Sequence, residues 1–435
     1  MPQRPENPKP AVSFAPTPAR IVWAAFLIRI AYMTLAHTYR FREYAFGHHF
    51  AFGFEMGRIG QALATGYGFA DPFYGHTGPT AWVGPLYPLL IGGVFKIFGV
   101  YTLKSSWVLL TINCALCALI VPAVWEIASR CFNQRVALWS AWIWALHPAA
   151  MQYAVRWVWE TTLTTLLFSW VLVLALRMRN IGGDPDQADS AMTTRRWACF
   201  GLLWGLIALS NASLLLFLPC CGLWILAGAK QWKRQLAGVL LSSLLCLACI
   251  APWTYRNWLV FHQVVPLRGN LGAELYLGNG PDANGLLMEY NHPNESLSQL
   301  ALYTKMGEIP YAKYRGQLAT TYIRANPGRF LLLSLKRVYY FWAGVPHPQG
   351  HFVTEFGRSL NFAFASLAGL LGLALALKRR TSGAILFALA FLTIPAVYYF
   401  ITVHARFRHP LEPLIAILGV YLFQSATRKK RSKMS

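Results

Sequence analysis

Long apolar runs, separated by short polar or basic stretches, make up most of this sequence. A helix that crosses a bilayer needs about 20 largely apolar residues. Most of the runs approach this length, so the pattern predicts an all-α polytopic membrane protein with a bundle of about ten transmembrane helices. The predicted spans are residues 20–37, 105–125, 136–150, 161–177, 197–210, 212–229, 235–251, 359–377, 383–403 and 411–425.

Basic residues lie beside alternate apolar runs, and this sets the direction of each span. Cytoplasmic loops carry an excess of Lys and Arg, so the basic clusters are placed inside. Both termini then lie in the cytoplasm. The clusters are residues 130–135, 177–196, 230–234, 378–380 and the basic tail 426–435.

The N-terminal stretch 1–19 is Pro-rich and basic and is predicted to be a disordered cytoplasmic segment. The apolar run 21–35 then passes into a polar stretch without a small-residue cleavage pattern. We therefore expect an uncleaved first transmembrane helix and not a signal peptide.

The first polar region, 38–104, is predicted to be an external loop within an N-terminal transmembrane module, 20–251. Its segment 85–100 is apolar but short and carries Lys96. If this segment crossed the membrane, every later basic loop would fall outside. It is therefore predicted to be an external helix in the membrane interface.

A second polar region, 252–358, is predicted to be a small external segment before the C-terminal helices, 359–425. Its part 329–343 combines apolar residues with charges and Trp342, which suits a second interfacial helix. The Gly, Asn and Asp residues of its turns do not indicate which substrate this segment would bind.

Composition agrees with a membrane protein. Hydrophobic residues make up 56% of the chain and charged residues 13%, against roughly 25% charged in soluble proteins. The net charge of +23 is not interpreted as nucleic-acid binding, because Lys and Arg collect at the ends of apolar runs. The eight cysteines lie in or beside apolar segments, so no disulfide framework is implied.

The stretch 52–88 is polar and rich in Gly and Pro, and it holds one conspicuous carboxylate, Glu55. A carboxylate at the external membrane surface can act as general base for a hydroxyl acceptor. The alternative is a solvated ion pair with Arg58, three residues further along a helix.

Glu160 stands at the start of an apolar span, directly after an external turn. An acid in that position is costly unless it faces a polar cavity, so it is a candidate site residue. The alternative is a carboxylate favoured by the helix dipole, or an ion pair with Arg156.

Arg406 and Arg408 are predicted at the external end of a span, beside His404. Arginine forks grip phosphate oxygens in bidentate fashion, so this pair is a candidate site for a lipid-linked phosphate. The alternative is snorkelling to lipid headgroups. Arg58, and Lys336 with Arg337, are further candidates for phosphate binding.

Aromatic residues near the interfacial helices, with His404, are candidates for a substrate groove. Trp82 and Tyr87 are the first of them, and ordinary interface anchoring explains such residues equally well. The histidines show no HxH or HExxH spacing, so the spacing assigns no metal ligands.

Six motifs lie in order along residues 20–425: FEMGRIGQALATGYGF, PLYPLLIGGVFKIFG, HPAAMQYAVRWVWETTLTTLLF, PWTYRNW, ANPGRFLLLSLKRVYYFW and ARFRHPLEPL. They resemble motifs of the GT-C-fold glycosyltransferases that use polyprenyl-phosphate sugars. This group includes protein O-mannosyltransferases and the aminoarabinose transferases that act on lipid A. The resemblance implies a GT-C-like helical bundle with external juxtamembrane helices.

The resemblance also implies roles for the two acids. Glu55 matches the family's catalytic first-loop acid, and Glu160 matches the acid of the second external loop. Family members often carry an Asp-Glu pair in the first loop, whereas Phe54 precedes Glu55 here. A single carboxylate weakens the case for a metal held by a pair. We assign no cofactor, and a divalent cation stays open.

Together these observations predict a multi-pass glycosyltransferase of a bacterial inner membrane, with its active site facing the periplasm. It would transfer a sugar from a polyprenyl-phosphate donor to a hydroxyl of a lipid, polysaccharide or protein, with inversion at the anomeric carbon. The alternative is a transporter or flippase for a lipid-linked or anionic substrate. Transporters place ionisable residues at mid-membrane on broken helices.

Overall fold

The computed structural model describes residues 17–41, 51–184, 186, 191–286, 289–345 and 352–432. Residues 1–16 of the predicted N-terminal segment lie outside this part of the chain. The described chain is helical, and its one β-bridge joins Ala70 to Pro79. The predicted all-α fold is confirmed.

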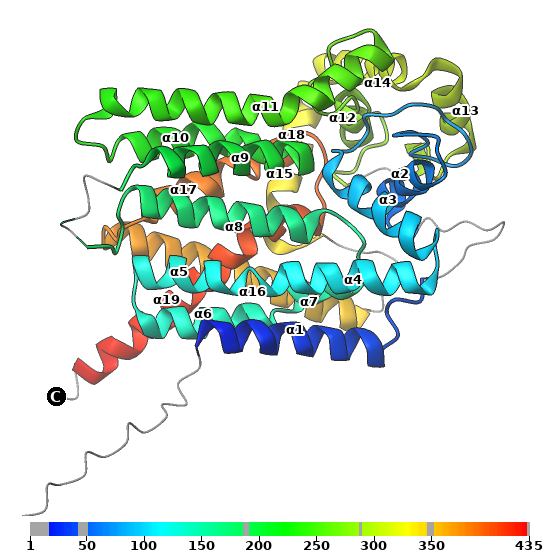
Figure 1. The fold of residues 1–435 in the computed structure, drawn as a ribbon. Coiled ribbons are helices and arrows are strands. Elements are labelled where there is room, and N and C mark those ends of the chain that lie inside the picture. The colour runs from blue at the N-terminus through cyan, green and yellow to red at the C-terminus, as the bar shows by residue number, and fades with distance from the viewer. Residues whose placement is uncertain are drawn as a thin grey trace, which may run out of the picture.

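A bundle of long, nearly parallel helices forms the body of the molecule (Figure 1). Helices α1, α4, α6 and α9 begin at a Thr or Asn whose side chain accepts a hydrogen bond from a backbone amide of the first turn, such as Thr102 before α4 or Thr193 before α9. The bundle helices are α1 Pro18–Leu35, α4 Leu103–Ala118, α5 Val121–Cys131, α6 Gln134–Leu146, α8 Thr161–Met178, α9 Thr194–Ser210, α10 Phe217–Leu226, α11 Leu236–Phe261, α16 Phe352–Lys378, α17 Ala384–Thr393, α18 Ala396–Phe400 and α19 Glu412–Ser432.

Five helical segments of the described chain are long and apolar enough to cross a membrane. The protein is therefore a multi-pass membrane protein. Shorter apolar helices fill the other predicted spans, among them Ala212–Leu226 and Ala384–Phe400. The five long segments are Pro18–Leu35, Leu103–Cys131, Thr161–Met178, Trp232–Phe261 and Glu355–Lys378.

One helix runs further than its apolar run predicts. The span expected at 235–251 continues through Pro252 to Phe261 as α11. Proline removes one helical hydrogen bond, but the turns after it are tied to the chain that follows. Trp253 Nε1 donates to the Leu267 carbonyl at 2.7 Å, and Asn257 Nδ2 donates to the Val265 carbonyl at 2.9 Å.

Small residues allow neighbouring helices of the bundle to approach closely. A Cβ atom on Gly201 of α9 would lie 2.2 Å from the Ser242 carbonyl oxygen of α11. A Cβ atom on Gly372 of α16 would lie 2.2 Å from the Leu418 carbonyl oxygen of α19. Glycine is therefore required at both crossings.

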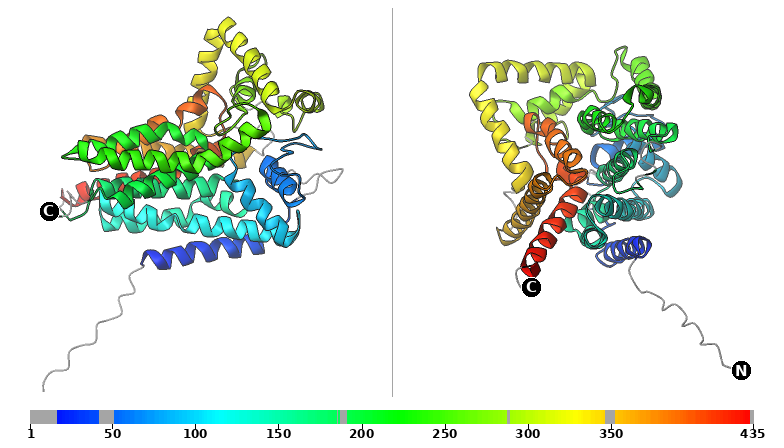
Figure 2. Two further views of the ribbon diagram at one scale, coloured as in Figure 1. Left: turned by 45° about the horizontal axis from the view of Figure 1, so that its top comes forward. Right: turned by 90° about the vertical axis from the view of Figure 1, so that its left-hand side faces the viewer.

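Helices α2, α3, α12, α13 and α14 gather at one end of the bundle, at the right of Figure 1, while α1 begins and α19 ends at the other end. The left view of Figure 2 shows the same separation of the two ends. The bounds of these helices and of the remaining two are α2 Phe54–Ala64, α3 Leu86–Phe98, α7 Pro148–Val155, α12 Leu271–Asn279, α13 Leu297–Met306, α14 Glu308–Ala325 and α15 Pro327–Ala343.

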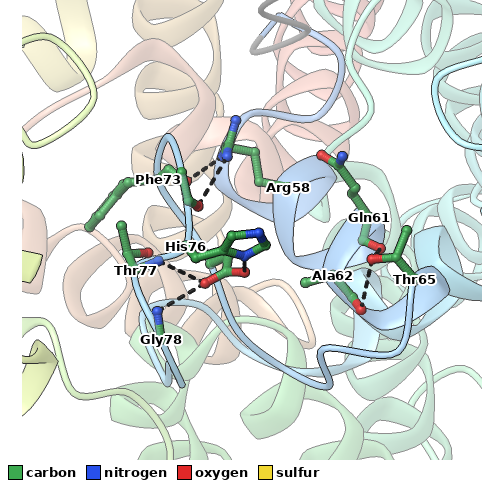
Figure 3. A network of polar contacts seen from close by, with 10 residues as sticks. Arg58, Gln61, Ala62, Thr65, Phe73, His76, Thr77 and Gly78 are labelled. Carbon is green, nitrogen blue, oxygen red and sulfur yellow. Dashed lines mark hydrogen bonds and ion pairs between the residues drawn. The ribbon is translucent and has the colours of Figure 1, made fainter.

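The loop between α2 and α3 folds around Asp71, whose carboxylate accepts hydrogen bonds from the Thr77 and Gly78 backbone amides at 2.8 and 2.9 Å. His76 Nδ1 lies 2.9 Å from the same carboxylate, and Figure 3 shows these contacts. Asp71 itself adopts a φ of +57°. The loop is thus held in one shape by its own side chains.

Glu308 of α14 joins this loop to α13 and α14. Its carboxylate accepts hydrogen bonds from the Thr80 hydroxyl, from the Ala81 backbone amide at 2.7 Å and from the Tyr303 hydroxyl at 2.9 Å. Arg256 adds hydrogen bonds to the Phe69 and Thr80 carbonyls at 2.6 and 2.8 Å. The loop and the segment after α11 therefore form one rigid platform.

Candidate active site

Glu55 lies in the first turn of α2, next to two residues with left-handed backbone angles. Gly53 has a φ of +87° and Phe54 a φ of +50°. A phenylalanine in this conformation is strained, and such strain often occurs at functional sites. The Phe54 ring lies 5.5 Å from the Trp157 ring and 5.3 Å from the Trp159 ring, centre to centre. The start of α2 thus packs against the segment that leads to Glu160.

The Glu55 carboxylate is largely buried, with 12% of the side chain exposed. Its Oε1 accepts a hydrogen bond from Asn294 Nδ2 at 2.9 Å. His292 Nε2 lies 3.7 Å from the same oxygen. Burial raises the pKa of Glu55, while the charges of Arg406 and Arg268 act to lower it. The carboxylate therefore stands in a field of positive charge.

Glu160 precedes α8 and is 8% exposed. Its Oε2 is buried without a hydrogen-bond partner among the described residues. Burial raises the pKa of Glu160 to about 7, against the opposing charges of Arg406 and Arg268, and the charge of Glu55 raises it further. The two acids thus interact with each other and with the same two arginines. A small crevice at Glu160 is lined by Thr161, Thr164, Asn211, Arg406, Phe407 and Pro410.

Arg406 belongs to η5, a short 3₁₀ helix at Ala405–Leu411. Its guanidinium carbon lies 4.4 Å from the centre of the Trp159 ring, close enough for a cation–π contact. Its Nε is buried and has no hydrogen-bond partner among the described residues. The guanidinium is therefore placed beside both acids without forming an ion pair of 4 Å or less with either.

Arg268, in the loop between α11 and α12, is the second cation of the site. Its Nε donates a hydrogen bond to the Trp82 carbonyl at 2.9 Å, which holds the side chain. Its charge acts on Glu55 and on Glu160. Sequence reasoning missed Arg268, and it missed His292 and Asn294 as well, because all three lie in irregular loops. An arginine shortly after PWTYRNW was the one available signal.

Two other predicted phosphate ligands lie in structural contacts. Arg408 is 1% exposed, and its Nε donates to Glu412 Oε1 at 2.7 Å while Nη1 donates to the Phe362 carbonyl at 3.1 Å. Arg337 is fully buried and donates to Asn279 Oδ1 at 3.0 Å and to the Gly278 carbonyl. Lys336, its neighbour on α15, is exposed.

Arg58 does not pair with Glu55, although the two share α2. Its Nε donates to the Phe73 carbonyl at 2.5 Å and its Nη2 to the Gly75 carbonyl at 3.5 Å (Figure 3). Arg58 thus supports the loop between α2 and α3. Arg156 likewise contacts Tyr32 Oη, at 3.4 Å, and not Glu160.

The three residues predicted for a substrate groove lie in different surroundings. Trp82 is buried, with its ring edge-on to His292 and 5.8 Å from it, centre to centre. Tyr87 is fully buried and donates a hydrogen bond to Asn113 Oδ1 at 2.9 Å. His404 is half-buried, and its Nδ1 accepts a hydrogen bond from the Arg406 backbone amide at 3.2 Å. Trp82 therefore contacts His292 and His404 contacts Arg406, whereas Tyr87 ties α3 to α4.

The site offers a poor donor set for a divalent cation. Oxygen-rich sites with several carboxylate or carbonyl ligands suit Mg²⁺, Ca²⁺ and Mn²⁺. Here two carboxylates face two guanidiniums, and no group of three or more His, Cys, Asp or Glu side chains suited to a metal occurs in the described residues. We derive no step through a metal.

These helices, with a polar site at one end of the bundle, form the GT-C fold of membrane glycosyltransferases, as the motifs implied. Residues 82–256 match the family of dolichyl-phosphate-mannose-protein mannosyltransferases. No curated protein matches the sequence.

Solved structures of an archaeal enzyme are similar in fold. The oligosaccharyltransferase AglB from Archaeoglobus fulgidus, in complex with an inhibitory peptide and a dolichol-phosphate, has a TM-score of 0.55 and 16% identity. The match covers 95% of this chain and 50% of that one. The same oligosaccharyltransferase, in complex with Zn and sulfate, has a TM-score of 0.53 and 16% identity, with coverages of 94% and 49%. The chain thus spans about half the length of these proteins.

ArnT from Cupriavidus metallidurans in the apo state is also similar. It has a TM-score of 0.39 and 15% identity, and the match covers 93% of this chain and 78% of that one.

Proposed function

We propose that this protein is a glycosyltransferase that takes a sugar from a polyprenyl-phosphate donor and passes it to a hydroxyl acceptor. One observation carries the proposal. Two buried acids, Glu55 and Glu160, share the field of two guanidiniums, Arg268 and Arg406, that have no carboxylate within 4 Å among the described residues. Cations held ready in this way suit a phosphate whose charge grows as it leaves.

The reaction follows from this arrangement. Glu55, in its ionised form, accepts the proton of the acceptor hydroxyl. The hydroxyl oxygen then forms a bond to the anomeric carbon as the bond from that carbon to the phosphate oxygen breaks. The electron pair leaves with the lipid phosphate, and Arg406 and Arg268 stabilise the added negative charge. Attack opposite the leaving group inverts the anomeric configuration.

Glu160 has a different role in the proposal. Its unpartnered Oε2 faces a crevice that also contains Arg406. The Glu160 carboxyl is suited to donate a hydrogen bond to a sugar hydroxyl in its neutral form, which would fix the ring next to the phosphate site. Arg408 and Arg337 are left out of phosphate binding, because their guanidiniums are held by Glu412 and by Asn279.

The donor class is supported by the fold and by the family match at residues 82–256. AglB, which shares the fold, has a solved structure in complex with an inhibitory peptide and a dolichol-phosphate. We place this chain in a bacterial inner membrane. The site is assigned to the periplasmic face, because α1 begins and α19 ends at the opposite end of the bundle, where the sequence is basic. The acceptor is a lipid, a polysaccharide or a protein.

The test is sugar transfer by purified protein in lipid, with labelled polyprenyl-phosphate donors and an extract of membrane glycolipids and polymers. Glu55→Gln keeps the shape of the side chain and removes the base, so we expect transfer to fall by at least about 100-fold with donor binding retained. Asp282→Asn, which neutralises an exposed acid of the external segment, is the matched control. If wild type binds donors but neither transfers nor hydrolyses them, the enzyme assignment fails and transport takes its place.

A further inference from the structure

The acid of α2 is held from the far side by a loop more than two hundred residues away. Asn294 Nδ2 donates to Glu55 Oε1 at 2.9 Å across 239 residues of sequence. His292 Nε2 lies 3.7 Å from the same oxygen. Both contacts fall on Oε1.

The backbone of the same loop selects the tautomer of His292. The Asn294 backbone amide donates to His292 Nδ1 at 3.3 Å, so Nδ1 carries the lone pair and Nε2 carries the hydrogen. Burial lowers the pKa of His292 to about 4, and the ring is therefore neutral at pH 7. Its N–H group is directed toward the carboxylate as a neutral dipole.

The His292 ring is itself fixed by aromatic neighbours of the loop between α2 and α3. It lies edge-on to Phe73 at 5.5 Å and to Trp82 at 5.8 Å, centre to centre. The external segment and the loop that follows α2 therefore meet at the oxygen of one acid.

We propose that Asn294, with His292, is a positioning residue that aims Glu55 at the acceptor. The inference rests on the function proposed above. Under this proposal Glu55 acts as the base only while the segment around residue 294 packs on α2. The enzyme would then favour an acceptor that holds this segment against α2, because such an acceptor keeps Glu55 in position.

A merely structural tie predicts a different outcome. It would lower thermal stability and leave the pH dependence of the surviving activity unchanged. A positioning contact acts on the base itself. Because the amide hydrogen bond favours the ionised carboxylate, its loss raises the pKa of Glu55.

The experiment compares Asn294→Ala, Asn294→Asp and His292→Phe with the control Asn284→Ala. Asn284 is an exposed asparagine of the same segment whose side chain bonds the Leu286 backbone amide. For Asn294→Ala we expect kcat to fall about 10- to 100-fold, an unchanged KM for the donor, and an acidic limb of the pH profile moved to higher pH. Asn294→Asp should move the limb further, because it places a second negative charge at Oε1.

A wild-type kcat and pH profile in Asn294→Ala would overturn the inference. Absence of transfer by wild type would instead overturn the proposed function. In that case the titration of the Glu55 carboxylate, followed by infrared difference spectra of wild type and Asn294→Ala, still tests whether Asn294 changes the pKa of Glu55. Identical titrations would overturn it.

A separate observation concerns a groove of about 1070 Å³ between α6, α16 and α19. Apolar side chains line its length, among them Trp139, Ile143, Phe364 and Phe423, all of them exposed. The groove extends from Arg135 to His147 along α6, roughly 18 Å at the helical rise per residue. This length matches the hydrocarbon depth of one leaflet, about half of 30 Å, with room for a headgroup link.

One end of this groove is polar, and it lies at the basic end of the bundle, opposite the candidate active site. Arg135 is exposed and has no ion pair among the described residues, and Gln424 Nε2 is buried without a hydrogen-bond partner there. Arg379 donates to Ser425 Oγ at 2.9 Å and marks the same end. The geometry points to a site for an anionic phospholipid, with its phosphate at Arg135 and Gln424 and one acyl chain along the groove.

The test uses delipidated protein with added phosphatidylglycerol, phosphatidylcholine or polyprenyl phosphate, and retained lipid is measured by native mass spectrometry. We expect wild type to retain phosphatidylglycerol about 5- to 10-fold better than phosphatidylcholine. Arg135→Gln combined with Gln424→Leu should lose the preference. The control Arg234→Gln alters a basic residue outside the groove and should keep it. Equal retention of the two phospholipids, or displacement of phosphatidylglycerol by polyprenyl phosphate, would overturn the proposal.

Discussion

The guanidinium of Arg406 lies over the ring of Trp159, 4.4 Å from its centre, one residue before Glu160 in the chain. The ring keeps the cation beside the acids without neutralising it, because a cation–π contact leaves the positive charge in place. Phe54 packs on the same tryptophan from the side of α2. Trp159 thus joins the first-loop acid, the second-loop acid and a phosphate-binding candidate in one unit.

Arg406 and Arg408 should respond to mutation in opposite ways. Arg406→Gln removes an unpaired charge, so donor affinity should fall about 10-fold or more with little change in melting temperature. Arg408→Gln leaves Glu412 buried without its partner, which costs roughly 3–5 kcal/mol of folding free energy. Donor binding and thermal unfolding in the same lipid measure both effects.

A melting temperature lowered as much by Arg406→Gln as by Arg408→Gln would contradict this division. The outcome would mean that Arg406 also supports the fold through Trp159.

The raised pKa of Glu160 predicts that donor binding depends on pH. Burial raises its pKa to about 7, so the carboxyl is neutral below that pH and ionised above it. The ionised form repels a phosphate held by Arg406, so donor affinity should fall as pH rises from 6 to 8. We expect a change of about fivefold, which corresponds to roughly 1 kcal/mol of charge repulsion.

Glu160→Gln carries no charge at any pH and should flatten the profile. Titration of donor binding by wild type and by this variant checks the sign. Wild-type affinity that stays constant over this range, or rises with pH, would contradict the role given to Glu160.

The contact between α2 and α3 requires glycine at residue 60. A Cβ atom there would lie 2.4 Å from Ile91 Cγ2. Gly60→Ala should therefore push the helices apart, at a cost of about 1–3 kcal/mol, and reduce transfer by moving Glu55. Gly93→Ala on α3 is the matched control, because a Cβ atom there meets no atom within 4 Å. The melting temperature should fall for Gly60→Ala and should not fall for Gly93→Ala.

Glu308 should matter for stability more than for chemistry. Glu308→Gln replaces an acceptor with a donor against the Ala81 amide or the Thr80 hydroxyl, and an unsatisfied buried group costs roughly 1–3 kcal/mol. We expect a lower melting temperature and faster proteolysis within residues 66–84. Asp282→Asn, at an exposed position, serves as control. Equal protease resistance of the two variants would show that the hydrogen bonds to Glu308 are not needed to hold the loop between α2 and α3.

Local rules predict much of this fold, because each element depends on residues close in sequence. Apolar runs identify the bundle helices, and the short run at 85–100 corresponds to α3, Leu86–Phe98. The end of α11 departs from its apolar run, since Trp253 and Asn257 tie its last turns to carbonyls of a following loop. Apolar patterning does not report such contacts.

The residue pattern alone predicts a helical membrane protein in which Glu55 and Glu160 are acids in polar stretches between spans. The cations that accompany these acids are set by tertiary packing. Arg406 and Arg408 lie two residues apart on η5, yet one faces Trp159 and the other forms a buried pair with Glu412. Arg268 and Asn294 join the site from loops, because packing brings together side chains that no local periodicity relates.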